Sequence, residues 1–368
     1  MNHSRDLADV LARRTLDLVN ISSVSGEEDA AADHAETFLR KHSSTRLLSR
    51  QGRAVVARLG SEAPLLVLGG HLDTVPPNEN AAPALRGDDV VGLGATDMKG
   101  ALAVMLTLAE RFVPAAAGGS NENTPRSLGL VFYDCEEIEF ARNGLRPLLD
   151  GETWLTEADL VLMMEPTDNL VELGCLGTLH ARVTFHGTAA HSARPWTGEN
   201  AIHLAAPFLD WLAGAPVQEV QSGSAVYREV ISATMAEGGT TRNVIPDRFT
   251  VNVNFRFAPD RTPDKAEEYL RSIVPKDATV EITDRAPSAP AHDEAPLLKQ
   301  LIAGQGLDSR AKQAWTDVAQ FAERGVPAAN FGPGIPELAH RRDESVPVSN
   351  LVRSYEVLAD FLGLAETP

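Results

Sequence analysis

Three short segments are apolar at nearly every position, and they constrain the fold more than any other feature. They span residues 64–70, 127–133 and 159–164. A strand that is apolar on both faces must be covered on both sides, which is typical of a parallel sheet between layers of helices. Apolar residues at helical spacing surround these strands, at 6–20, 28–42, 99–112, 294–304 and 350–363. The sequence therefore predicts an α/β domain with a mostly parallel central sheet.

A different pattern begins after about Gly177. Polar and apolar residues alternate at 180–185 and 250–257, which predicts antiparallel strands with one covered face. Helical spacing appears at 198–213 and 263–273, and a Pro/Ala-rich stretch at 286–291 resembles a linker. We predict an α/β domain made of residues 1–176 and 291–368, interrupted by an inserted α+β domain at 177–290.

Composition excludes several classes of protein. The 368 residues include 33 Lys+Arg and 51 Asp+Glu, a formal net charge of −18, which argues against binding to nucleic acid. Two cysteines cannot form a disulfide framework, and they lack zinc-finger spacing. No segment has the roughly 18 consecutive apolar residues of a membrane span, and the start shows no secretory signal. We therefore expect a cytoplasmic protein without a membrane or nucleic-acid partner.

Carboxylate and imidazole side chains follow the ends of the predicted buried strands. Taken singly, each is most often part of a solvated loop. Parallel strands, however, present their carboxyl ends at one edge of a sheet, where ligands bind. Five loops carry such side chains: His71 and Asp73; Asp97; Asp134, Glu136 and Glu137; Glu165; and His340, Asp343 and Glu344.

Gathering these carboxylates without a counter-charge would be costly, because neighbouring like charges raise one another's pKa. A pair of divalent cations removes the conflict. Carboxylate and imidazole ligands without thiolate suit zinc, with cobalt or manganese as possible substitutes. The sequence therefore predicts a metal centre at this edge.

Seven segments, between about residue 65 and residue 345, form a recognisable series; five contain these side chains and two lie in the insert. They are Gly70–Pro76, Gly94–Gly100, Cys135–Glu137, Met164–Thr167, Gly187–Pro195, Gly239–Pro246 and Gly332-Pro333 followed by His340. In this order they resemble the motifs of the M20 family of co-catalytic zinc amidohydrolases. The resemblance implies a zinc-exopeptidase-like catalytic domain with an inserted lid or dimerisation domain.

The resemblance also implies two zinc ions per subunit. His71, Asp97 and Glu165 would hold one ion. Asp97, Glu137 and His340 would hold the other, with Asp97 bridging. Asp73 would accept the second ring N–H of His71 and fix its tautomer. The peptide bond between Asp97 and Met98 would be cis.

Glu136 would be the general base that activates water for attack on an amide carbonyl. Adjacent extended side chains point in opposite directions, so Glu137 can bind metal while Glu136 faces the water.

In the family, the histidine that corresponds to His191 reaches the active site of the other subunit and stabilises the oxyanion, which implies a homodimer through the insert. The alternative is a structural histidine. Arg242, Asn243 and Arg256 are candidates for contacts with an anionic substrate. Thr316 lies in a polar loop that the family places near the substrate, although a helix N-cap would explain it equally well.

The implied substrate is a small N-acyl amino acid. Segments 133–137, 241–247 and 339–344 resemble most the actinobacterial members that hydrolyse N-succinyl-LL-2,6-diaminopimelate in lysine biosynthesis. The better-known form of the family members with this activity carries an Arg-Arg pair before the insert, where this chain has Cys175-Leu176-Gly177. Alternative substrates are acetylornithine, another N-acyl amino acid and a dipeptide. Two alternative classes of protein are a non-catalytic metal-binding dimer and a hydrolase with Ser192 as nucleophile.

Overall fold

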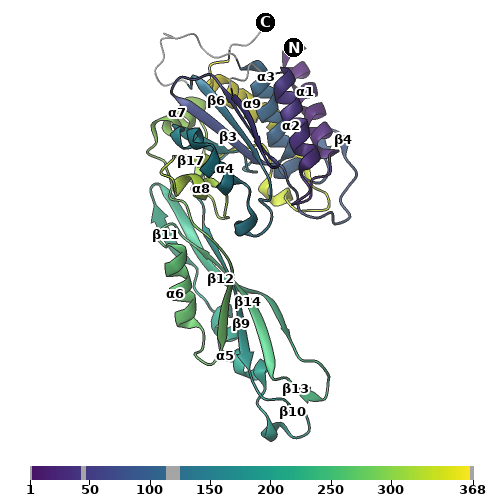
Figure 1. Ribbon diagram of the computed structural model, residues 1–368, viewed down its shortest axis with the longest axis vertical. Coiled ribbons are helices and arrows are strands. Elements are labelled where there is room, and N and C mark those ends of the chain that lie inside the picture. Colours follow the sequence, from purple (N-terminus) through teal and green to yellow (C-terminus); the bar gives the residue numbers. More distant parts are fainter. Residues whose placement is uncertain (1, 43–46, 113–124, 365–368) are drawn as a thin grey trace. The chain divides into compact units, whose positions relative to one another are not determined.

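The computed structural model describes residues 2–42, 47–112 and 125–364. Contacts divide the chain into two units (Figure 1). The first contains the residues up to Gly174, Ala291–Ala311 and the residues from Thr316 onward, and the second contains Cys175–Pro290 and Lys312–Trp315. The sequence predicts the insert at 177–290 and gives no sign that Lys312–Trp315 packs with it.

The first unit is built on an eight-stranded sheet. Its order is β1 (Leu47–Gln51), β2 (Ala54–Leu59), β6 (Ser127–Tyr133), β3 (Leu65–His71), β7 (Leu160–Met163), β17 (Ala328–Asn330), β8 (Val171–Leu173) and β16 (Ser309–Ala311). The four central strands β6, β3, β7 and β17 are parallel to their neighbours in this group. Antiparallel pairs occur towards the edges. The predicted α/β class with a mostly parallel central sheet is therefore confirmed.

Helices cover both faces of this sheet (Figure 1). They are α1 (Asn2–Val19), α2 (Asp29–His42), α3 (Gly100–Arg111), α4 (Leu145–Gly151), α7 (Pro296–Gln305), α8 (Val318–Ala322) and α9 (Val348–Phe361). Every residue of β3, β6 and β7 is buried, which explains why these strands are apolar on both faces. The five helices predicted for this part of the chain are confirmed to within a few residues.

A small three-stranded sheet in the same unit was not predicted. It consists of β4 (Ala84–Arg86), β5 (Asp89–Val91) and β18 (Ser345–Pro347). Strands of three residues are too short to show a period. Single helical turns lie at η1 (Ala95–Lys99), η2 (Phe140–Arg142), η3 (Thr153–Glu157), η4 (Pro195–Thr197, in the second unit) and η5 (Pro336–Leu338).

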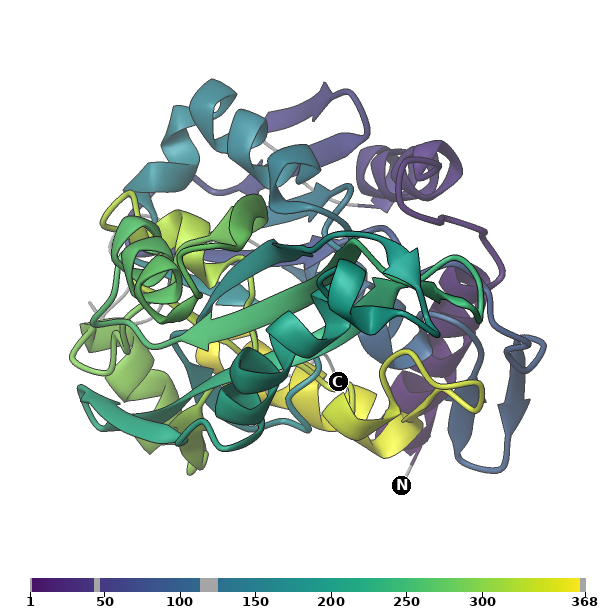
Figure 2. The same cartoon turned by 90° about the horizontal axis from the view of Figure 1, so that it is seen from below.

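The second unit is an antiparallel sheet with two helices on one face (Figure 2). The strand order is β11 (Gln218–Ser222), β12 (Ala225–Gly238), β14 (Arg248–Phe257), β9 (Gly177–His186) and β15 (Thr279–Ala286). A short pair is formed by β10 (Ala190–His191) and β13 (Val244–Ile245). Asn200 is the N-cap of helix α5 (Ala201–Ala213), and its side chain accepts a hydrogen bond from the Ile202 N–H at 2.9 Å. Thr262 is the N-cap of helix α6 (Pro263–Ile273), and its side chain accepts a hydrogen bond from the Lys265 N–H.

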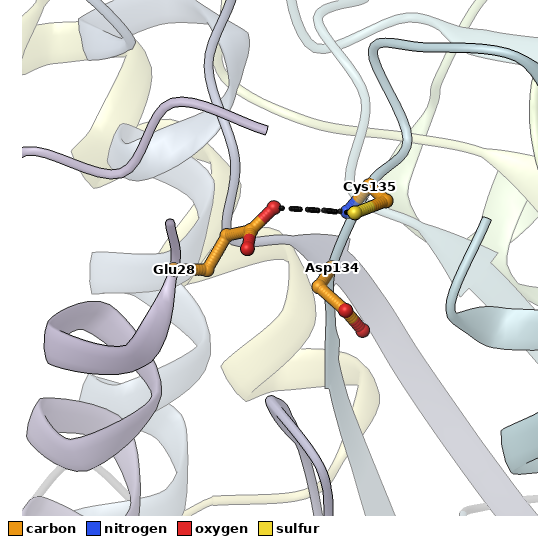
Figure 3. Close-up of side chains that lie close together, drawn as sticks. All are labelled: Glu28, Asp134 and Cys135. Atoms are coloured by element: carbon orange, nitrogen blue, oxygen red, sulfur yellow. Dashed lines mark hydrogen bonds between the residues drawn. The ribbon is translucent and has the colours of Figure 1, made fainter. Parts of the chain in front are cut away.

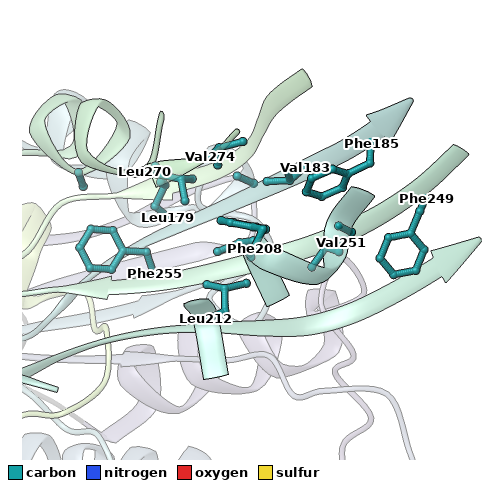
Figure 4. Packing of buried hydrophobic residues seen from close by; sticks show 14 of the residues in the cluster. Leu179, Val183, Phe185, Phe208, Leu212, Phe249, Val251, Phe255, Leu270 and Val274 are labelled. Atoms are coloured by element: carbon teal, nitrogen blue, oxygen red, sulfur yellow. The ribbon is translucent and has the colours of Figure 1, made fainter. Parts of the chain in front are cut away.

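Alternation along β9 and β14 builds the core of the second unit. Val183 and Phe185 of β9, with Val251 and Phe255 of β14, face Phe208 of α5 in one buried cluster (Figure 4). The intervening residues are mostly polar and lie on the opposite face of the sheet. The prediction of antiparallel strands with one covered face is therefore confirmed, and the structure shows that these two strands pair with each other.

No helix within the described ranges is long and apolar enough to cross a membrane.

Candidate metal centre

The four central strands of the first unit end together. His71 at the end of β3 is in register with Tyr133 at the end of β6. Met163 at the end of β7 is in register with Asn330 at the end of β17. The loops that follow therefore start side by side, and they carry the predicted metal ligands.

Two overlapping groups of donor atoms form at this edge. The ligand atoms of His71, Asp97 and Glu165 lie within 4.8 Å of one another, and so do those of Asp97, Glu137 and His340. Asp97 belongs to both groups. Its Oδ1 is 3.1 Å from Nε2 of His71, and its Oδ2 is 3.5 Å from Nε2 of His340. One carboxylate oxygen of Asp97 therefore faces each of the two imidazoles.

The carboxylates of the site raise the pKa of both of its imidazoles. Nε2 of His340 is 2.8 Å from Oε1 of Glu137, and this hydrogen bond, with the nearby charge of Asp97, raises the pKa of His340 to about 9 although burial opposes it. Burial lowers the pKa of His71, but Asp73 and Asp97 raise it by more. Without metal, protons on these two imidazoles offset part of the negative charge.

The donor set fits a pair of divalent cations. It consists of two imidazoles and three carboxylates, with no thiolate, which suits zinc, cobalt or manganese. His71 and Glu165 are buried, whereas the His340 side chain is 50% exposed. One side of the site is therefore open to solvent.

Glu344 holds the loop that contains Asp97. Its buried carboxylate accepts the N–H groups of Gly94, Thr96 and Asp97 at 2.9–3.0 Å. The Asp97–Met98 peptide bond is cis, as predicted. These contacts fix the direction in which the Asp97 side chain leaves the backbone.

Asp73 holds the turn that carries the two glutamates. Its Oδ1 accepts from the Glu136 N–H and its Oδ2 from the Glu137 N–H, both at 3.0 Å. Burial raises the pKa of Asp73, but His71, the Ser25 hydroxyl and the Glu137 N–H outweigh it and lower the pKa to about 2.

The contact between Asp73 and His71 differs in detail from the prediction. Nδ1 of His71 is 3.0 Å from the Asp73 carbonyl oxygen and 3.5 Å from its carboxylate Oδ1. The nearest acceptor for the ring N–H is therefore the backbone carbonyl of Asp73. The Asp73 carboxylate mainly accepts hydrogen bonds from the N–H groups of Glu136 and Glu137.

Glu136 lies beside both donor groups. A carboxylate oxygen of Glu136 is within 4.8 Å of ligand atoms of His71 and Glu137. Burial raises the pKa of Glu136, and the charges of Glu165, Glu137 and Asp317 raise it further, while His71 lowers it. A raised pKa suits a group that accepts and returns a proton near neutral pH.

A third group of potential ligands, Glu28, Asp134 and Cys135, supports the same turn (Figure 3). Oε1 of Glu28 accepts the N–H groups of Gly26 and Cys135, and its Oε2 lies 3.6 Å from Nε of Arg53. Burial and the neighbouring carboxylates, Glu28 first, raise the pKa of the Cys135 thiol to about 12. The hydrogen bonds that Glu28 accepts from the Gly26 and Cys135 N–H groups hold this turn in place.

Gly332 brings the loop after β17 against Glu165. A Cβ at Gly332 would lie 2.4 Å from the carbonyl oxygens of Met164 and Glu165. Only glycine allows this approach, which explains the glycine in the Gly332-Pro333 motif.

The predicted substrate contacts are divided between the two units. His191 on β10 is exposed and pairs with Val244 of β13, and the Ser192 N–H donates to the Asn243 carbonyl at 2.9 Å. Arg242 lies in the exposed loop between β12 and β13. These residues form one group within the second unit.

Arg256 and Thr316 lie elsewhere. The loop that carries Arg242 lies near the start of β14, whereas Arg256 lies near its end. At about 3.3 Å per residue, the two ends of this strand are roughly 25 Å apart. Thr316 is 2% exposed and belongs to the first unit.

Sequence reasoning missed three carboxylates that support the site: Glu28, Glu344 and Asp317. Glu344 was expected at this edge of the sheet only because it follows His340, and Asp317 lies next to Thr316 in the predicted polar loop, where a helix N-cap would explain it. Glu28 resembled an ordinary helix start.

Comparison with known proteins identifies the class. A model of peptidase family M20/M25/M40 matches residues 67–363, so the chain belongs to this family of hydrolases. Among curated relatives, "Putative succinyl-diaminopimelate desuccinylase DapE" of Mycobacterium tuberculosis is 42% identical over 95% of this chain and 97% of its own length. The succinyl-diaminopimelate desuccinylase of Corynebacterium glutamicum is 36% identical over 94% of both chains.

Solved structures agree on the fold. An M20 family metallo-carboxypeptidase from Sulfolobus solfataricus aligns with a TM-score of 0.75 at 16% identity, over 96% of this chain and 98% of its own.

Proposed function

We propose that this protein hydrolyses N-succinyl-LL-2,6-diaminopimelate to succinate and LL-2,6-diaminopimelate, using two zinc ions per subunit, with cobalt or manganese as possible substitutes. The chemistry rests on one observation: Asp97 belongs to two groups of metal-binding atoms, and the partly buried Glu136 lies beside both groups. The relatives named above, which match over nearly the whole chain, support the substrate.

The chain's own residues would supply binding, orientation and proton transfer. His71, Asp97 and Glu165 would hold one ion, and Asp97, Glu137 and His340 the other. The bound ions would lower the pKa of a water molecule and polarise the amide carbonyl. Glu136 would take a proton from that water as its oxygen attacks the carbonyl carbon. Glu136 would then give the proton to the nitrogen as the C–N bond breaks.

The second unit would supply contacts with the substrate. His191 would stabilise the oxyanion in the active site of a second subunit. Arg242, Asn243 and Arg256 offer groups that recognise carboxylates, and this substrate is rich in carboxylates. Thr316 would contribute through the loop before α8. Cys135 and Cys175 are buried and not joined in a disulfide, which is consistent with a reducing compartment, and we place the reaction in the cytoplasm.

A substrate panel tests the reaction. Purified, zinc-loaded protein is assayed with N-succinyl-LL-2,6-diaminopimelate, N-acetylornithine and a dipeptide at matched concentrations. We expect kcat/KM for the succinyl compound to exceed the others by at least about a hundredfold, because unpaired polar groups in a site built for carboxylates disfavour analogues that lack them. Faster turnover of acetylornithine or the dipeptide would reject the proposed substrate and favour another N-acyl amino acid deacylase or a dipeptidase.

The second unit supports a homodimer. Residues Ile231–Gly238 of β12 pair with β14 on one edge, and β11 pairs only with Ala225–Glu229. Within the described part of the chain, no strand pairs with the other edge of Ile231–Gly238. Met235 in this segment is 72% exposed. An exposed apolar edge strand is a ready template for another chain, so we propose that a second copy pairs there.

Charge on this edge should separate the subunits. The chain mass is 39.5 kDa, so light scattering should give about 79 kDa, which is twice that value, for the wild type. We expect Met235→Lys to shift the mass towards 39.5 kDa. Val226→Lys, at an exposed position where β11 covers the strand edge, is the matched control and should remain dimeric. A monomeric wild type would contradict the proposed dimer.

A further inference from the structure

We propose that Asp317 is a positioning residue for hydrolysis: its carboxylate holds both ends of the loop that carries Glu136 and Glu137. The proposal rests on the proposed function, because it acts through Glu136 as the base. Asp317 comes from a distant part of the sequence, directly before α8, and it is fully buried.

Asp317 contacts the residue before segment 134–143 and the last residue of that segment. Its Oδ2 accepts the Tyr133 hydroxyl at 2.7 Å, and Tyr133 is the last residue of β6. Nδ2 of Asn143 donates to Oδ1 at 3.1 Å and to Oδ2 at 3.0 Å. Asn143 lies six residues after Glu137, so the carboxylate ties together the two ends of segment 134–143.

Other contacts close the base of the same loop. The Gly144 N–H donates to the Asp134 carbonyl at 2.9 Å. A Cβ at Gly144 would lie 2.0 Å from Oδ1 of Asp134, so a larger residue at this position would displace the Asp134 side chain. Nε2 of Gln320 donates both to Asp317 and, at 3.0 Å, to Oδ1 of Asn143. The same Asn143 oxygen accepts from the Leu145 N–H at 2.9 Å, where α4 begins.

This network is linked to the metal centre. The Tyr133 ring meets the His71 ring edge-on, with the centroids 6.4 Å apart. Asp73 holds the middle of the loop through the N–H groups of Glu136 and Glu137. Asp317 therefore fixes the ends while Asp73 fixes the centre. Proton transfer needs heavy atoms about 2.6–3.2 Å apart, so a small drift of Glu136 would slow the reaction strongly.

The chemistry of the contacts requires a carboxylate. Tyr133, Asn143 and Gln320 all donate hydrogen bonds to Asp317, and none of the three is charged. Burial raises the pKa of Asp317, while these hydrogen bonds lower it. An asparagine at this position would point an N–H group at a donor and leave the network incompletely paired.

Asp317→Asn tests the proposal on the zinc-loaded protein. We expect kcat to fall about 10- to 100-fold, while KM stays within about threefold and two metal ions per chain are retained. Amide hydrogen exchange should accelerate in peptides covering 134–143 but not in those covering β3. Glu172→Gln is the matched control, because Glu172 is also a buried carboxylate of the first unit and is paired with Arg310 at 2.8 Å. This control should leave kcat and exchange in 134–143 unchanged.

Three results would overturn the proposal: a kcat within twofold of wild type with normal exchange, a loss of kcat that matches a loss of metal, or the same local exchange in Glu172→Gln. If Asp317→Asn does not fold, Tyr133→Phe replaces it. We then expect a fall in kcat of about 3- to 10-fold with faster exchange in 134–143, and wild-type behaviour would overturn the proposal. Failure of the proposed function is separate, because it appears as a wild type that does not turn over the succinyl substrate.

Discussion

Glu136→Gln should lower kcat by about a thousandfold while two metal ions per chain remain bound. Glutamine has nearly the same shape as glutamate but cannot accept a proton from the attacking water. The Glu136 backbone N–H donates to Asp73, and this contact does not depend on the side chain. Steady-state kinetics and elemental analysis of the same preparation measure the two effects.

The neighbouring glutamate provides the control. Glu137 belongs to one of the donor groups, with Asp97 and His340. We therefore expect Glu137→Gln to lower the metal content as well as the rate. Full activity of Glu136→Gln would exclude Glu136 as the base and revive a nucleophile such as Ser192.

Asp97→Ala should remove both metal ions and lower activity by at least about a thousandfold, because the site would lose the water activation that bound metal supplies. Asp97 is the one residue shared by the His71–Asp97–Glu165 group and the Asp97–Glu137–His340 group. His340→Ala, which touches one group, should lose about one ion.

Asp343→Ala is the matched control for Asp97→Ala. Asp343 is an exposed aspartate three residues after His340, and it pairs with Arg341 at 2.9 Å. Its replacement should change neither metal content nor rate. Retention of two tightly bound ions by Asp97→Ala would contradict the bridging role.

Local patterns in the sequence were sufficient to predict the central sheet. The apolar segments that form β3, β6 and β7 are buried on both faces. Because both faces are covered, nearly every residue of these strands must be apolar, and this pattern is easily recognised in the sequence. Because parallel strands end at one edge, the motif residues after them could be expected to converge before any coordinates were known.

Contacts between distant segments were beyond sequence reasoning. Glu344 accepts N–H groups from a loop almost 250 residues earlier, and nothing in its own neighbourhood indicates this. Asp317 stands where a helix N-cap is expected, yet its side chain makes no capping hydrogen bond and turns to Tyr133 instead. Contacts with backbone N–H groups and buried hydroxyls produce no periodic pattern in the sequence. The residues that support the site could therefore be identified only from the structure.

The most direct test of the central claim is an anomalous diffraction map of zinc-loaded crystals. We predict two zinc peaks in each chain, roughly 3.5–4 Å apart, with one oxygen of Asp97 facing each. His71 and Glu165 should complete one site, and Glu137 and His340 the other. A single peak, or two peaks that do not share Asp97, would contradict the proposed metal centre.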